Sequence, residues 1–208
     1  MAEAPPYRHS GAGHRLDPDE LYASPPPWDL GRPQSAFLAL AERGAIRGRV
    51  LDVGCGTGEH VLMCAERGLD ATGIDLAAVA LQTARTKARQ RGLSARFLHH
   101  DVLRLAELGE SFDTVLDCGL YHLPLFTSTD RARYVDNVRA VLVTGGRYFM
   151  LCFSDREPGE LGPRRITGEE IAATFADGWL IDSIEPATLE ITTDPAGIRG
   201  WLVAATRT

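Results

Sequence analysis

The chain has 208 residues, of which 24% are charged and 44% hydrophobic, a globular balance rather than a disordered one. At roughly 150 residues per domain, one main domain is expected. The net charge of −6 argues against a general binder of nucleic acids or anionic membranes. No apolar run reaches the ~20 residues of a bilayer span, and no secretory leader is evident, so a cytoplasmic protein is expected.

Residues 1–33 contain seven prolines, which exclude a long helix or a central strand. Tyr22 and Trp28 nevertheless lie in this segment. A disordered tail does not need such large side chains, so we expect an N-terminal arm (residues 1–33) that packs, from about Asp17 onward, on a domain formed by residues 34–208. The cysteines have no CxxC spacing and lie in apolar stretches, which favours buried thiols and no metal site; they are Cys55, Cys64, Cys118 and Cys152.

From Gln34 onward, strand and helix patterns alternate. Strands are predicted over residues 49–53, 70–75, 95–100, 112–117 and 145–153. The intervening helices include 76–90, one capped by Ser128 or Thr129, and 168–176. Two further strand-like runs, 179–193 and 198–206, are joined by the turn 194–197, which is too short for a parallel crossover. The pattern predicts an α/β fold with a doubly wound, seven-stranded, mostly parallel sheet that ends in an antiparallel hairpin.

A glycine-rich loop, Gly54-Cys-Gly-Thr-Gly58, separates the first strand from the next helix. In open α/β sheets, ligands bind beyond the carboxyl ends of the strands, and glycines there let the backbone approach them closely. Asp75 stands at the end of the second strand, where a carboxylate can accept both hydroxyls of a ribose. The combination predicts a ligand that carries a nucleoside.

The residues around this loop bear on which nucleoside binds. A dinucleotide fingerprint requires a small residue where Glu59 stands. Asp52 and Glu59 flank the loop, and carboxylates next to a pyrophosphate are unfavourable. A phosphate-free donor with cationic groups, such as S-adenosylmethionine, fits this charge pattern better than NAD.

The motifs resemble those of class I S-adenosylmethionine-dependent methyltransferases. Residues 50–58 (Val-Leu-Asp-Val-Gly-Cys-Gly-Thr-Gly) match the first motif, and Gly73-Ile-Asp75, His100-Asp101, 112–117 and 142–149 resemble the later ones. The resemblance implies methyl transfer from S-adenosylmethionine. It also implies a set of cofactor-binding residues: Asp75 at the ribose, Asp101 and Val102 at the adenine, Gly54, Gly56 and Asp117 near the methionine moiety, and in addition Asp52 and Leu76.

Two segments resemble narrower groups. Residues 27–34 (Pro-Trp-Asp-Leu-Gly-Arg-Pro-Gln) are similar to the lid of thiopurine and thiol/halide methyltransferases. Residues 116–122 (Leu-Asp-Cys-Gly-Leu-Tyr-His) are similar to a turn in bacterial enzymes that methylate heterocyclic toxins such as hydroxyquinolones. These resemblances imply a small, aromatic or heterocyclic acceptor, methylated at O, N or S, and a role in detoxification.

Several residues are candidates for the acceptor side. His122, just past the fourth strand, is either a general base or a residue that only orients the substrate or packs in the turn. Tyr121 either donates a hydrogen bond or buries its ring. Tyr22 and Trp28 are candidates for the lid, and Trp28 is also a candidate for a contact with the sulfonium. Phe126 and Phe153 are candidates for the lining of the acceptor pocket, and Arg156 for pairing with an anionic acceptor. Each of these residues also has an ordinary structural interpretation.

Two other classes of function remain open at this stage: an NAD-dependent oxidoreductase, which Glu59 argues against, and a domain that binds the nucleoside without catalysis. The turn after the fourth strand lacks the Asn/Asp-Pro-Pro-Tyr/Phe sequence of base- and amide-methylating relatives. We therefore expect a small-molecule substrate, no nucleic acid, no membrane, and a monomer or homodimer.

Overall fold

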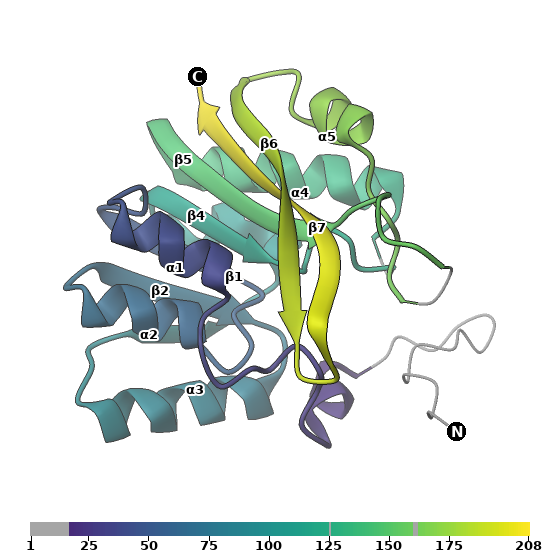
Figure 1. The fold of residues 1–208 in the computed structure, drawn as a ribbon. Coiled ribbons are helices and arrows are strands. Elements are labelled where there is room, and N and C mark those ends of the chain that lie inside the picture. Colours follow the sequence, from purple (N-terminus) through teal and green to yellow (C-terminus); the bar gives the residue numbers. More distant parts are fainter. Residues whose placement is uncertain (1–16, 125, 160–161) are drawn as a thin grey trace.

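The computed structural model describes residues 17–124, 126–159 and 162–208 (Figure 1). Residues 1–16 of the N-terminal arm lie outside the described residues. The sheet has seven strands in the order β3-β2-β1-β4-β5-β7-β6, and only β7 runs antiparallel to its neighbours. This arrangement confirms the predicted fold. The strands are β1 (Arg49–Val53), β2 (Asp70–Asp75), β3 (Arg96–His99), β4 (Phe112–Cys118), β5 (Leu142–Phe153), β6 (Trp179–Ile191) and β7 (Asp194–Arg207).

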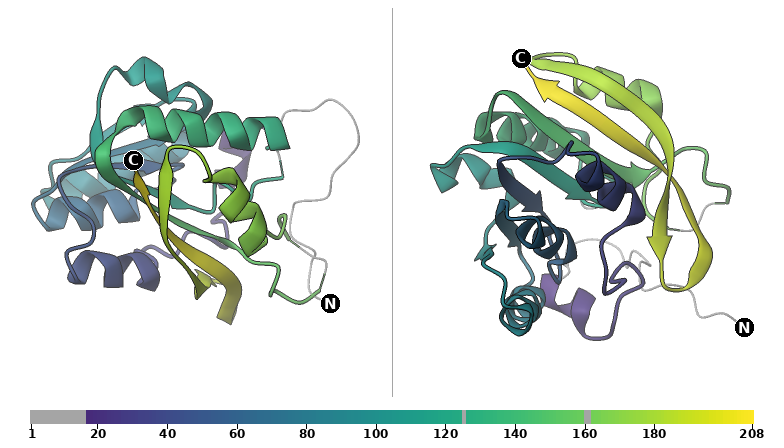
Figure 2. Two further views of the ribbon diagram at one scale, coloured as in Figure 1. Left: turned by 90° about the horizontal axis from the view of Figure 1, so that it is seen from above. Right: turned by 60° about the vertical axis from the view of Figure 1, so that its left-hand side comes forward.

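Helices cover both faces of the sheet, as Figure 2 shows. One face packs against α1 (Ser35–Glu42), α2 (Glu59–Glu66) and α3 (Ala78–Arg91). The other face packs against a 3-10 segment, η2 (Val102–Leu108), and against α4 (Ser128–Val141) and α5 (Gly168–Thr174). A short 3-10 helix, η1 (Pro18–Tyr22), belongs to the N-terminal arm. Within the described residues, no helix has both the length and the apolar character to cross a membrane.

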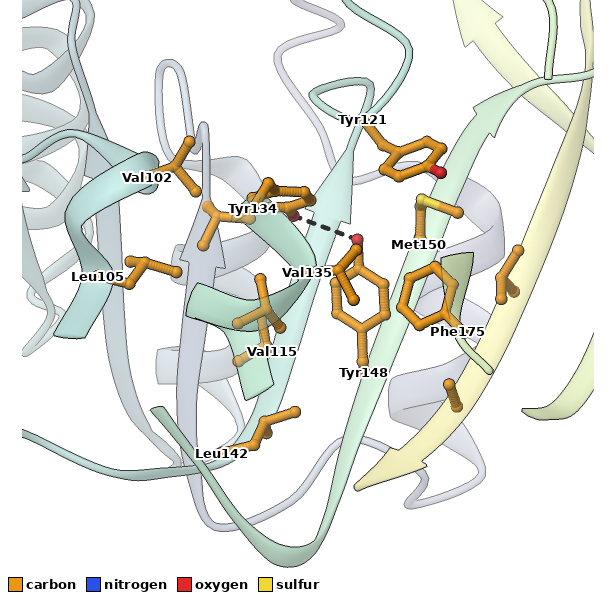
Figure 3. Close-up of a cluster of buried hydrophobic side chains, with 14 of the residues drawn as sticks. Val102, Leu105, Val115, Tyr121, Tyr134, Val135, Leu142, Tyr148, Met150 and Phe175 are labelled. Carbon is orange, nitrogen blue, oxygen red and sulfur yellow. Dashed lines mark hydrogen bonds between the residues drawn. The ribbon is translucent and has the colours of Figure 1, made fainter. Parts of the chain in front are cut away.

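The core under α4 and α5 is rich in aromatic rings (Figure 3). Tyr148 of β5 stacks on Phe175 with ring centroids 5.5 Å apart, and Phe175 meets Trp179 edge-on at 5.3 Å. The hydroxyl groups of Tyr134 and Tyr148 lie 3.2 Å apart inside this core. Aromatic pairs of this kind add to the free energy gained by burial alone.

Two local boundaries differ from those predicted. Helix α4 is capped by Thr127, not by Ser128 or Thr129, because Thr127 and Asp130 form a reciprocal capping box. The hairpin turn lies at residues 192–193, whereas residues 194–197 belong to β7. Strands β6 and β7 stay paired on both sides of residues 195–197, because Leu189 pairs with Ile198 and Ile191 pairs with Asp194. The register shifts between these two pairs. The Pro-Ala-Gly sequence therefore forms an irregularity within β7 and not the turn.

Candidate active site

The glycine-rich loop follows β1 at the carboxyl edge of the sheet. Gly54, Gly56 and Gly58 all have positive φ values, a region that side chains with a Cβ rarely adopt. A Cβ at Gly58 would lie 2.7 Å from Cε1 of Phe97, so the start of α2 also needs glycine for close packing. The loop therefore presents backbone and no side chain at Gly54 and Gly56.

Asp75 joins this loop to the end of β2. One carboxylate oxygen accepts the Gly56 N–H at 2.8 Å, and the other accepts the Ala77 N–H at 2.8 Å. Each oxygen keeps a second lone pair, so the carboxylate can still accept both hydroxyls of a ribose. Burial raises the pKa of Asp75, although the backbone hydrogen bonds lower it. The backbone carbonyl of Leu76, whose side chain is exposed, lies 2.9 Å from His99 Nε2.

The end of β3 brings the predicted adenine residues next to Asp75. The N–H of His100 donates to the Asp75 carbonyl at 3.2 Å. Asp101 caps η2 by accepting the Leu103 N–H at 2.9 Å, and Val102 is buried behind it. The structure thus brings Gly54, Gly56, Asp75, Leu76, Asp101 and Val102 to adjacent strand ends, where the sequence predicted them.

One of the two acids expected to flank the loop, Glu59, has other partners, and this corrects the charge argument. Glu59 is buried and pairs with Lys87 at 2.8 Å and Arg91 at 3.1 Å, so its charge is neutralised. Asp52 is 1% exposed and faces His60 of α2, with 3.8 Å between Asp52 Oδ2 and His60 Nδ1. The preference against pyrophosphate cannot be assigned to a bare carboxylate at Glu59.

The described part of the N-terminal arm lies against the loop. The Tyr22 hydroxyl stands 2.7 Å from where a Cβ on Gly56 would be, and the Tyr22 ring meets Trp28 edge-on at 6.3 Å. Burial and the nearby Asp75 raise the pKa of Tyr22. Thr57 of the loop donates its hydroxyl to Asp29 at 2.8 Å. These contacts place both predicted lid aromatics beside the glycine loop.

The hairpin of β6 and β7 continues beyond the end of β5 and meets the arm at its tip, next to the purple segment in Figure 1. The Thr192 N–H donates to the Pro27 carbonyl at 2.8 Å. The buried Gln34 side chain donates to the Glu190 carbonyl at 3.0 Å and accepts the Glu190 N–H at 2.8 Å. The Glu190 carboxylate accepts the Ser35 N–H at the start of α1 and pairs with Arg32 at 2.9 Å. We call this group, residues 32–35 with Glu190, the hairpin latch.

His122 lies in the β4–α4 loop, and its surroundings differ from those of a general base. Its Nδ1 accepts the Phe153 N–H at 3.1 Å, so the neutral ring carries its hydrogen on Nε2. The ring is 4% exposed and packs on Phe153 at 4.5 Å. Burial lowers the pKa of His122 to about 3. A neutral imidazole with an Nε2–H is a hydrogen-bond donor, so this geometry suits the second of the two predicted roles, orienting the substrate, better than removal of a proton.

Tyr121 and Asp117 turn into the core and away from the loop. The Tyr121 hydroxyl donates to Thr174 at 3.0 Å, and the ring is fully buried among the aromatics in Figure 3. Asp117 is 0% exposed and accepts hydrogen bonds from the hydroxyl groups of Tyr134 at 2.7 Å and Tyr148 at 2.8 Å. Tyr121 thus buries its ring, which is one of its two predicted roles, whereas Asp117 contacts two tyrosine hydroxyl groups where a contact with methionine was predicted.

The other acceptor candidates divide between the core and a cavity. Phe126 packs on Tyr134 at 5.9 Å, in the core, and Phe153 packs on His122. Arg156 is exposed and its guanidinium lies over the Trp201 ring at 5.6 Å. A cavity of about 260 Å³ opens beside Arg156 at the end of β5, and Arg199 also lines it. The sequence reasoning missed Arg199, because only the antiparallel pairing of β7 with β5 brings it to the end of β5.

Comparison with known proteins agrees with this geometry. Residues 50–146 match the methyltransferase domain family. The 2-heptyl-1-hydroxyquinolin-4(1H)-one methyltransferase of Mycobacteroides abscessus is 33% identical over 182 residues, 86% of this chain and 79% of the relative. The probable thiol methyltransferase 2 of Arabidopsis thaliana is 29% identical over 61% of this chain and 56% of its own length.

Solved structures agree as well. One solved structure matches with a TM-score of 0.80 and 36% identity, over 88% of this chain and 85% of the matched chain. It comes from work on the conversion of a disulfide bond into a thioacetal group during echinomycin biosynthesis. Magnesium protoporphyrin IX methyltransferase from Synechocystis, with bound S-adenosylmethionine, shares the fold at a TM-score of 0.65 and 19% identity, over 84% of this chain and 77% of that one. With a loop that has no side chain at Gly54 and Gly56, and with the Asp75 carboxylate suited to an adenosine, the chain belongs to the S-adenosylmethionine-dependent methyltransferases, and S-adenosylmethionine is its methyl donor.

Proposed function

We propose that this enzyme methylates an oxygen, nitrogen or sulfur atom of a small aromatic or heterocyclic molecule of the hydroxyquinolone type. One observation supports this most: the neutral His122 ring, packed on Phe153 at the ligand edge, offers an Nε2–H that no described residue accepts. An aromatic wall with one donor suits a flat acceptor that carries an oxygen. The relative from Mycobacteroides abscessus is named for such an acceptor.

S-adenosylmethionine, when bound, supplies an electrophilic methyl group on a sulfonium. The chain's own residues hold the partners and exclude water, because methyl transfer depends mainly on positioning the acceptor in line with the methyl group. Asp75 and the glycine loop hold the adenosine, with Asp101 and Val102 beside the adenine. His122 orients the acceptor by donating from Nε2. An acceptor whose hydroxyl is acidic enough to be ionised at the working pH has already given its proton to solvent and needs no base.

The N-terminal arm is the proposed lid. Tyr22 and Trp28 lie beside the glycine loop, and the hairpin latch ties the end of the arm to the β6–β7 hairpin. In this proposal the described part of the arm, residues 17–33, covers the domain of residues 34–208, and Trp28 lies against the sulfonium or the acceptor ring. Phe126 packs on Tyr134 in the core and is not part of the proposed acceptor wall.

A thiol or thiopurine S-methyltransferase is the second candidate. The similarity to a probable thiol methyltransferase favours it, together with the sequence of residues 27–34.

We also propose a detoxifying role, action in the cytoplasm without nucleic acid, and a monomer or homodimer. Four free cysteines, three of them buried, suit a reducing compartment.

The test is an acceptor panel. The purified protein is incubated with methyl-labelled S-adenosylmethionine and with thiols, phenols, hydroxyquinolones or azaheterocycles, and label transfer is measured. Transfer to hydroxyquinolones supports the leading proposal, and transfer to thiols alone supports the second. If the protein binds S-adenosylhomocysteine but labels none of these classes, the proposed acceptor class is wrong.

The role of His122 is tested by a pH profile. Because burial lowers the pKa of His122 to about 3, the ring stays neutral across the whole working range. The kcat/KM for an acceptor that is already ionised should therefore show no inflection between about pH 5.5 and 8. An inflection near pH 6.5 that disappears in His122→Gln would instead show an imidazole that takes up protons. Asn137→Gln, at a half-buried position on α4, is a control.

A further inference from the structure

The cavity at the end of β5 has arginine on two sides. It is lined by Ser154, Arg156, Pro186, Ala187, Thr188, Arg199 and Gly200. Its volume of about 260 Å³ is below that of pockets that enclose a whole drug-sized ligand, so it suits one end of a small molecule. The apolar surface of Pro186 and Ala187 lies next to the two guanidinium groups.

Both arginines are held in place. The Arg156 guanidinium lies over the Trp201 ring, whose Nε1–H is fixed by the Ile166 carbonyl at 3.0 Å. Arg199 donates from Nη1 to the Arg156 carbonyl at 3.2 Å. A guanidinium that is already positioned loses less freedom when it binds an anion.

Neither guanidinium forms an ion pair with a carboxylate among the described residues. The two nearest acids in sequence are engaged elsewhere. Asp155 accepts the Trp201 Nε1–H at 3.2 Å, and Glu157 accepts the backbone N–H of Arg199 at 2.7 Å. The cavity therefore keeps two positive charges whose donors remain available to a ligand.

The cavity lining begins at the residue that follows the proposed acceptor wall in the chain. The N–H of Phe153 donates to His122, and the next residue, Ser154, begins the cavity lining, about 3.8 Å further along the chain. Ser154 is fully buried, and its hydroxyl and N–H both donate to the Arg199 carbonyl at 3.0 Å. These bonds fix Arg199 relative to the end of β5.

We propose that Arg156 and Arg199 bind a carboxylate on the acceptor, remote from the atom that is methylated. The natural acceptor is then an aromatic or heterocyclic acid. This inference rests on the proposed function and narrows it, because it assigns an anionic group to the substrate. Arginine pairs with carboxylates through two parallel hydrogen bonds, which gives selectivity over an uncharged analogue.

The test compares two probes that differ only in this group, 4-hydroxyquinoline-2-carboxylate and 4-hydroxyquinoline. Each is titrated by calorimetry into protein saturated with S-adenosylhomocysteine, and again without it. The wild type should bind the carboxylate at least about tenfold more tightly. Arg156→Gln and Arg199→Gln should each remove most of that preference. Arg47→Gln, exposed before β1 at the opposite edge of the sheet, should keep it.

Equal binding of the two probes by the wild type, no binding of the carboxylate, or a preference that survives in both arginine variants would overturn the proposal. If the protein does not bind S-adenosylhomocysteine, that result contradicts the proposed function and not the carboxylate site. In that case the titration of the two probes in the absence of S-adenosylhomocysteine still tests the cavity. Thermal unfolding of each variant confirms that the fold is intact.

Discussion

Asp75 is the side chain on which donor binding depends most directly. Its carboxylate holds Gly56 and Ala77 and has lone pairs left for two ribose hydroxyls. Asp75→Ala should weaken binding of S-adenosylhomocysteine by about 2–4 kcal/mol, since two hydrogen bonds to a charged group are lost. Calorimetry measures the change. Asp70→Ala, at the exposed start of the same strand, is the control, and equal affinities in the two variants would refute the role of Asp75.

Asp117 makes stability depend on pH. Burial raises its pKa to about 6, despite the hydrogen bonds from Tyr134 and Tyr148 that lower it. Folding favours the protonated form, so the stabilisation from Asp117 is fully present below pH ~3.8 and is lost as the pH rises through about 6. The loss is on the order of 3 kcal/mol.

The variant Asp117→Asn keeps the shape of the side chain but does not titrate. The difference in unfolding free energy, variant minus wild type, should therefore increase between about pH 4 and pH 7, because only the wild type loses the contribution of Asp117. Urea denaturation at each pH measures this difference. Asp136→Asn, whose carboxylate is 70% exposed, should leave the profile unchanged. Parallel profiles for Asp117→Asn and the wild type would contradict the assignment.

The sequence located strand ends well but not the directions of the side chains. Asp75 and Asp117 both end parallel strands, yet one faces the glycine loop and the other faces α4. Alternation along β4 explains this, because Asp117 shares a face with Val115, which packs in the core under α4. The partners of Glu59 could not be predicted, because Lys87 and Arg91 come from another helix.

At the scale of elements, the hairpin latch joins the first helix to the last strand pair. Gln34 is 3% exposed and makes two hydrogen bonds to the backbone of Glu190. Gln34→Ala should lower the unfolding free energy by about 1–3 kcal/mol, since a buried N–H and a carbonyl lose their partners. Amide hydrogen exchange near residues 188–196 should accelerate. Gln90→Ala, exposed on α3, is the control, and unchanged exchange in Gln34→Ala would contradict the latch.

The elements themselves were largely predictable, because alternating strand and helix patterns and a short final connection allow few topologies. The contacts of the arm were not. Proline and aromatic residues indicated that it packs, but Pro27, Arg32 and Gln34 find their partners around Glu190, far along the chain. Local sequence has no signal for such a pairing.

For the whole molecule, ligand binding should appear as added stability. S-adenosylhomocysteine at about 100 times its Kd stabilises the fold by about 2.7 kcal/mol. For a chain of this size the Tm should rise by about 5–11 °C. Differential scanning calorimetry measures the shift, with NADH as the matched nucleotide control. A shift with NADH and none with S-adenosylhomocysteine would contradict the assigned donor.

The hairpin latch also sets an order of events during synthesis. Pro27 and Gln34 leave the ribosome well before Glu190 and Thr192, the residues that hold them. Domains begin to fold from the N-terminal side while the chain is still growing. The nascent protein therefore completes its glycine loop first, and the arm is fastened only when the final hairpin emerges.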